Sequence, residues 1–445
     1  MTDELHRWLD GRTRDELQDI VLGLVASVPG TGERLRLSML DETQDDAGLM
    51  AEVNAVLAPR LRFYDYRQAN RYADEAQDLV QLLRDSAESA DADFIRVIER
   101  ALTLTVRTAL RSDTSSGAQG MQVEDLLGAH ATAVAAAAPS LTTKEKRRIG
   151  EWIYKFRYDG KQDYFDPDIV AYAEALGPDV VEAYRKRILA TDLGDYGTYP
   201  LVRLAILDRD VDAIVEASGG KPTHAAVAMR LVQALDEAGL ADAALEYAEF
   251  GLTLQWFHQT GPLASYVVER YLADGRPEAA MELRWSRLRA HPSYTTFDEL
   301  RRAASSLGLW ESERDDAEAV LRSGSPADYL RLLVEGRRTD EAWALANEEP
   351  DAASRAGVWE QLCAVRAETH PAETLPVYRD LVWSWLETAH RSNYQGAAEL
   401  MKAMRAAARR AGDNDGYERF LDEVVEKNRR RPACMEIFAR HGLLT

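Results

Sequence analysis

The residues best suited to catalysis or metal binding are widely scattered in this chain. Eight histidines occur, at His6, His130, His224, His258, His291, His370, His390 and His441. No two lie three or four residues apart, so no helix can present a paired-histidine metal site. One Glu-x-x-His unit, Glu387 to His390, has no second copy, and a di-iron carboxylate bundle needs two. We interpret this unit as an exposed ion pair and expect no metal site.

Nucleophiles and phosphate-binding loops are equally poorly supported. Cys363 and His370 are seven residues apart, which on a helix is about 10 Å and too far for direct thiolate activation. Cys363 is therefore predicted to be a small core residue. The chain has no Gly-x-Ser-x-Gly motif. Gly30-Thr31-Gly32 and Gly219-Gly220-Lys221 lack the glycine–lysine spacing of a P-loop. We expect no catalytic residue and no cofactor.

A basic cluster stands out near the C-terminus of an otherwise acidic chain. It consists of Lys427, Arg429, Arg430 and Arg431. Cations near the C-terminus of a helix complement its dipole, so a solvated helix end is the favoured interpretation. The alternative is a docking patch for an acidic partner or for nucleic acid.

The composition narrows the classes of partner and compartment. The 445 residues carry a net charge of −21, which repels phosphate backbones and makes nonspecific nucleic-acid binding by the whole chain unfavourable. No stretch reaches the roughly 18 uninterrupted apolar residues of a membrane span. The first residues are acidic, unlike a secretory signal, and the two cysteines cannot form a disulfide framework. We expect a cytoplasmic protein with no membrane association.

The elements around these residues are helical from end to end, and strand-like alternation is nearly absent. Gly239, Gly275, Gly308 and Gly336 each follow one helical pattern and precede another, at spacings of 36, 33 and 28 residues. These spacings bracket the roughly 34-residue period of tetratricopeptide repeats. The sequence therefore predicts an all-α fold, an α-solenoid of tetratricopeptide-like helical hairpins with a helical N-terminal region.

Four helix pairs are predicted in the repeat region, joined by short turns that force antiparallel packing. They are 223–238 with 242–254, 263–274 with 277–290, 297–307 with 312–321, and 327–335 with 340–347. Longer helices near 372–390, 394–411, 415–428 and 432–441 are predicted to cap the array. Between the second pair, Gly275 can adopt the left-handed conformation and Pro277 suits a first helical turn.

Loop-like composition at Ser112–Gly120 divides the chain further. We predict an N-terminal helical region over 1–112, a middle aromatic-rich helical region over 121–221, and the repeats with their capping helices over 222–445. The aromatic side chains of the middle region, from Ile149 to Tyr199, suit either a partner surface or the junction between two helical regions. The junction is the favoured interpretation.

Several stretches resemble the helical region of bacterial SWIM zinc-finger proteins and related helical proteins. They begin at Thr13 (TRDELQDIVLGL), Phe63 (FYDYRQA), Glu151 (EWIYKF), Leu272 (LADGRPEAAMEL, followed by His291-Pro-Ser), Arg391 (RSNYQGAAELM) and Arg430 (RRPACME). The resemblance implies a helical-repeat adaptor. It does not carry over zinc binding, because the Cys-x-Cys and Cys-x-His motif of those proteins is absent from this sequence.

The leading functional hypothesis is a non-catalytic scaffold that binds a protein partner through the concave face of the repeats. Five residues are candidates to line that face or the core beneath it: Trp256, His258, Tyr294, Trp310 and Trp343. The first alternative is an enzyme with a site between repeats, using the segment Trp152–Tyr199 with His258 or His291. The second is a nucleic-acid accessory protein that uses the basic cluster.

Overall fold

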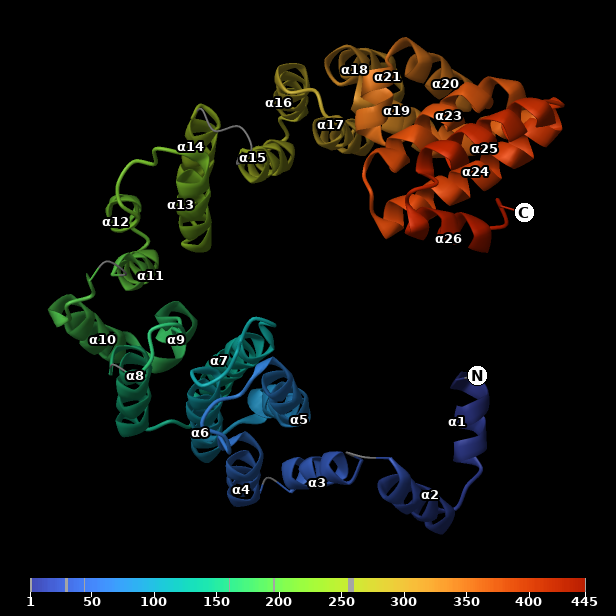
Figure 1. The fold of residues 1–445 in the computed structure, drawn as a ribbon. Coiled ribbons are helices and arrows are strands. Elements are labelled where there is room, and N and C mark those ends of the chain that lie inside the picture. Colours follow the sequence, from blue (N-terminus) through green and yellow to red (C-terminus); the bar gives the residue numbers. More distant parts are fainter. Residues whose placement is uncertain are drawn as a thin grey trace. The chain divides into compact units, whose positions relative to one another are not determined.

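The computed structural model describes residues 2–28, 31–43, 45–159, 161–194, 197–254 and 260–444. Over these ranges the protein is all-α, which confirms the predicted fold class (Figure 1). The described residues form twenty-six α-helices, one short 3-10 turn (η1, Ser86–Ser89) and an isolated bridge between Tyr64 and Ser112. Among the described helices, none combines the length and apolar character that crossing a membrane requires.

The chain divides into two compact units, Met1–Leu254 and Gln255–Thr445. Within the first unit, the helix before the loop-like stretch Ser112–Gly120 packs directly on the helix after it. The three sequence-derived ranges 1–112, 121–221 and 222–445 stay a prediction.

The first unit is built on a bundle of helices α4 to α7. Its helices are α1 (Thr2–Asp10), α2 (Arg14–Ser27), α3 (Thr31–Glu42), α4 (Asp46–Leu57), α5 (Tyr66–Asp85), α6 (Ala92–Ala109), α7 (Ala118–Ala137), α8 (Thr143–Tyr158), α9 (Ile169–Leu176), α10 (Pro178–Ala190), α11 (Thr198–Asp208), α12 (Val211–Ala217), α13 (Ala225–Glu237) and α14 (Ala241–Leu252). The central helix α6 packs on α4 and α7. Ile95, Ile98 and Leu102 on α6 are fully buried at helical spacing, so one apolar stripe forms this core.

The second unit is a succession of helical hairpins. Its helices are α15 (Gly261–Ala273), α16 (Pro277–Ala290), α17 (Tyr294–Ser306), α18 (Trp310–Gly324), α19 (Pro326–Glu335), α20 (Thr339–Glu348), α21 (Pro350–Ala356), α22 (Trp359–Thr369), α23 (Pro371–Glu387), α24 (Arg391–Ala411), α25 (Asn414–Asn428) and α26 (Pro432–Arg440). From α15 to α21 and from α22 to α26 each helix packs on the next along the chain, and α16, α17, α19, α20, α22 and α24 each also pack on the helix two places further on. This order is the local pattern of hairpins that need a neighbour on each side.

The turns between paired helices rest on single residues with a left-handed backbone. Gly239, Gly275 and Gly308 have φ angles of 73°, 69° and 72°. The fourth marker differs: Gly336 has a φ angle of −74°, and Arg337 takes the left-handed conformation at 56°. The sequence therefore locates this turn correctly, but the left-handed residue is one place later than the glycine.

Replacing Gly275 by alanine tests the turn directly. A side chain in the left-handed region costs about 1–2 kcal/mol, so Gly275→Ala is expected to lower the free energy of unfolding by about 1 kcal/mol. The matched control is Gly261→Ala at the start of α15. An added Cβ meets no atom within 4 Å at either position, and only Gly275 has a positive φ. Urea unfolding of both variants checks this, and an equal midpoint for the two would contradict it.

Candidate functional site

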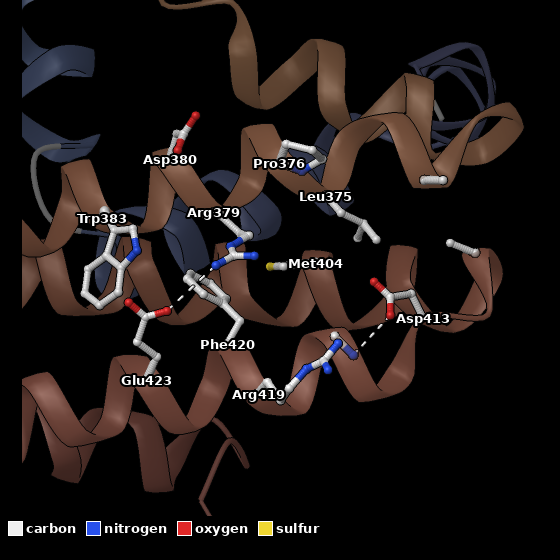
Figure 2. A pocket seen from close by; sticks show the side chains of 13 residues that line it. Leu375, Pro376, Arg379, Asp380, Trp383, Met404, Asp413, Arg419, Phe420 and Glu423 are labelled. Atoms are coloured by element: carbon white, nitrogen blue, oxygen red, sulfur yellow. Dashed lines mark hydrogen bonds and ion pairs between the residues drawn. The ribbon is translucent and has the colours of Figure 1, made fainter.

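A groove of about 830 Å³ lies among α23, α24 and α25 in the second unit. Figure 2 shows the side chains that line it. The lining consists of Ala372, Leu375, Pro376, Arg379, Asp380, Trp383, Met404, Ala411, Asp413, Gly416, Arg419, Phe420 and Glu423. Helices α23 and α25 supply most of the polar groups, and α24 supplies Met404 and Ala411.

Local sequence explains how the two principal helices border this groove. Helix α23 starts at Pro371 and contains Pro376 in its interior. Because Pro376 has no N–H, the Ala372 carbonyl loses its ordinary helical donor, and both residues line the groove. At the start of α25, the Asp413 carboxylate accepts a hydrogen bond of 3.1 Å from the Gly416 amide. A Cβ at Gly416 would lie 2.3 Å from Asp413 Oδ2, so a larger residue there would require the Asp413 side chain to shift.

The groove combines an aromatic wall with charges of both signs. Trp383 and Phe420 meet edge to face at a centroid distance of 5.8 Å. The Arg379 guanidinium lies 4.9 Å from the Phe420 ring centre and 3.7 Å from the Glu423 carboxylate. In Figure 2, Arg379, Trp383 and Glu423 lie on one side of the groove and Asp413 and Arg419 on the other. Arg419 is exposed and has no ion-pair partner among the described residues.

The lining is suited to binding and poorly suited to covalent chemistry. No serine, threonine, cysteine, histidine, tyrosine or lysine is among the residues that line it, so it offers no side-chain nucleophile other than carboxylates. Apolar and aromatic surface flanked by fixed charges is the composition of a recognition site.

Of the five sequence-predicted partner residues, three fall within the described residues, and none of the three lines this groove. Trp343 is 8% exposed and packs edge to face against Trp359 in the core. Trp310 is half-buried against Phe297. The Tyr294 hydroxyl donates a 2.7 Å hydrogen bond to Glu335. Trp256 and His258 lie outside the described residues.

The basic cluster is largely tied to neighbouring groups. Lys427 pairs with Glu423 at 3.2 Å and also lies 4.3 Å from the ring centre of Trp383. Arg429 pairs with Glu426 at 2.9 Å. Arg431 donates a 2.7 Å hydrogen bond to the Leu386 carbonyl at the end of α23, where a cation is favourable.

In the same cluster, Arg430 is exposed and has no ion-pair or hydrogen-bond partner in the described part of the chain. Its role as part of a docking patch stays a prediction.

A second polar cluster, missed by the sequence reasoning, lies inside the first unit. His130 Nδ1 is 2.9 Å from the Tyr172 hydroxyl, and His130 Nε2 is 3.5 Å from the Glu99 carboxylate. Arg148 donates to both oxygens of Glu99, at 2.9 and 2.7 Å. The Trp152 ring lies against the imidazole, with centroids 4.3 Å apart. The only sequence signal was one histidine in an alanine-rich helix.

This cluster has the residue types of an acid–base site but no access for a substrate. His130 is fully buried and Tyr172 is 1% exposed. Burial lowers the pKa of His130, so its imidazole is neutral near pH 7. Burial alone would raise the pKa of Glu99, but hydrogen bonds from His130 and Arg148 outweigh it and hold the pKa below its ordinary value. The cluster is therefore a structural link between α6, α7, α8 and α9.

Both cysteines are also buried. The described residues contain no group of three histidine, cysteine or acidic side chains able to hold a metal ion. Burial raises the pKa of Cys363 to about 12 and that of Cys434 to about 11. Thiols with such pKa values carry little reactive thiolate near neutral pH. Cys363 is fully buried in the core, as its sequence context predicted.

The buried imidazole of His130 makes the stability of the fold depend on pH. An unfolded chain protonates His130 at an ordinary pKa near 6.5, whereas the lowered pKa disfavours protonation in the folded state. Its contribution to stability is therefore present above about pH 6.5 and is lost as the pH falls below that value.

In urea unfolding, we expect the free energy of unfolding of His130→Gln to fall less than that of the parent when the pH is lowered from 7.5 to 5.5. Tyr172→Phe keeps the imidazole but removes its 2.9 Å partner, so this control keeps the parent's pH slope. Equal slopes for the parent and His130→Gln would contradict the assignment.

The chain matches no protein-family model, and no curated protein is significantly similar to it in sequence. The resemblance to the helical region of SWIM zinc-finger proteins therefore stays a prediction.

Proposed function

We propose that this chain is a non-catalytic scaffold that binds a segment of a protein partner in the groove among α23, α24 and α25. The single observation that carries the proposal is the composition of this groove. It has apolar and aromatic side chains, charges of both signs and no side-chain nucleophile other than carboxylates in its lining. We further propose that the second unit is an α-solenoid, supported by the packing of helices one and two places apart along the chain.

The chemistry of the groove indicates the kind of segment it would hold. The half-buried Leu375 and Trp383 supply apolar contacts above the buried Met404 and Phe420, while Arg419 supplies an exposed cation without an ion-pair partner among the described residues. An amphipathic helix with apolar residues three and four positions apart and a carboxylate beside them fits both features. The groove among α23, α24 and α25 therefore replaces the aromatic residues of earlier repeats as the proposed partner surface.

We also propose a cytoplasmic location. Both cysteines are free and buried, which suits a reducing compartment in which disulfides are not needed. The two alternatives from the sequence gain no comparable support. His130 and Tyr172, the acid–base side chains beside Trp152, are buried. In the basic cluster, two of the four cations are paired with glutamates.

A charge reversal in the groove tests the proposal. The tagged chain is captured from the cells that express it natively, and the partner that co-purifies is identified by mass spectrometry and titrated against purified chain. We expect Arg419→Glu to weaken binding at least tenfold, or about 1.4 kcal/mol, because the exposed cation becomes a repelling charge. Trp383→Ala is expected to weaken binding as well by removing the aromatic wall.

The matched control is Arg430→Glu, which makes the same charge change on an exposed residue outside the groove and is expected to bind normally. Binding lost in Arg430→Glu but retained in Arg419→Glu would contradict the groove assignment and favour the basic cluster. A chain that recovers no partner at all would contradict the scaffold itself.

A further inference from the structure

Helix α2 carries the most unusual surface of the first unit. Its second half, from Ile20 to Val28, contains no charged residue, and the whole helix contributes no buried residue. Val21, Leu22, Leu24, Val25 and Val28 are 38–64% exposed. A helix segment that is apolar on all sides is normally buried, so this surface requires a cover.

Helix α3, which packs on α2, extends this apolar surface, and helix α1 carries further exposed apolar side chains. Leu5 and Trp8 on α1, and Leu35 and Met39 on α3, are also exposed. Together the nine side chains leave on the order of 600 Å² of apolar area in water, at or above the largest patch of a typical monomer. A stable protein interface buries about 800 Å² on each partner. The exposed area is therefore close to what a dimer needs.

The charges of α2 favour a second copy of the same helix as the cover. Its charged residues, Arg14, Asp15, Glu16 and Asp19, all lie in its first six positions. If two α2 helices pack antiparallel about a two-fold axis, their uncharged halves overlap and their acidic ends point to opposite sides. Such an interface is self-complementary, as two-fold symmetry requires. At Gly23 an added Cβ meets no atom within 4 Å, so the helix surface there is open to close approach.

A lipid surface fits these helices less well. Residues 2–43 contain five arginines, no lysine and nine acidic residues, whereas helices that lie on membranes are rich in lysine and arginine on their polar face. An anionic bilayer would repel this segment.

We propose that the apolar half of α2, from Ile20 to Val28, is a homodimerisation surface that packs antiparallel against the α2 of a second copy of this chain. The second copy covers the exposed Leu22, Leu24 and Val25 side chains and leaves the acidic ends of both helices in solvent. This inference does not depend on the proposed partner groove, which lies in the other unit.

The test is the mass of the full chain in solution, measured by light scattering over a dilution series. The parent is expected to run at about twice its 49.8 kDa chain mass. The double variant Leu22→Glu, Val25→Glu is expected to raise the dissociation constant at least about a hundredfold, because two carboxylates per copy would enter an apolar contact. The control Leu189→Glu, on α10 and 67% exposed, is expected to stay dimeric.

A covalent test of the pairing uses Leu24→Cys, near the middle of the apolar half, with the native cysteines buried. Mild oxidation is expected to give a disulfide-linked dimer, whereas Leu189→Cys gives none. Far-UV circular dichroism confirms that the variants are folded.

Three outcomes would overturn the proposal. They are a parent at single-chain mass at every concentration, a glutamate double variant that remains dimeric, and a monomer that co-floats with phosphatidylglycerol vesicles, which would assign the surface to lipid.

Discussion

The left-handed turn that joins paired helices such as α15 and α16 or α17 and α18 is the interaction on which the second unit depends. In this turn one residue takes the left-handed conformation, and the next N–H bonds back across the end of the preceding helix. At Gly275 the Arg276 amide donates to the Tyr271 carbonyl at 2.8 Å, and at Gly308 the Leu309 amide donates to Ala304 at 2.8 Å. The bond satisfies a carbonyl that the helix end leaves free. It also reverses the chain within a few residues, so consecutive helices must lie antiparallel.

Small residues then let those antiparallel helices approach one another. Four fully buried alanines lie on α16, α17, α18 and α20: Ala280, Ala304, Ala317 and Ala342. Alanine has no flexible side chain to order, and it favours the helix at the same time. The hairpins therefore stack on their own sequence neighbours. The longer helices α23 and α24 continue this packing, and their contact with α25 creates the groove.

How far the sequence predicts this fold depends on which residue carries each turn. The turns marked by a glycine were predicted from the sequence, and the two helices of all four predicted pairs form and are in contact. The pair α11 and α12 was missed because Arg209, at a φ of 54°, occupies the position where glycine serves elsewhere. The pair α21 and α22 was also missed, although Gly357-Val358-Trp359-Glu360 repeats the pattern Gly308-Leu309-Trp310-Glu311.

The candidate site was beyond the reach of sequence patterns for a different reason. Its residues come from three helices. Arginine and aspartate occur on most described helices and tryptophan on several, so nothing marks Trp383 or Arg419 in advance. The same holds for the His130 cluster, whose other members lie 18 to 42 residues from His130 in the sequence.

The scaffold account can be tested most directly by hydrogen–deuterium exchange, comparing the chain alone with the chain bound to its co-purified partner. Amides of residues 371–423, which include α23, α24 and the part of α25 that lines the groove, are predicted to gain protection on binding. Protection that is absent from these helices and confined to other parts of the chain would contradict the account.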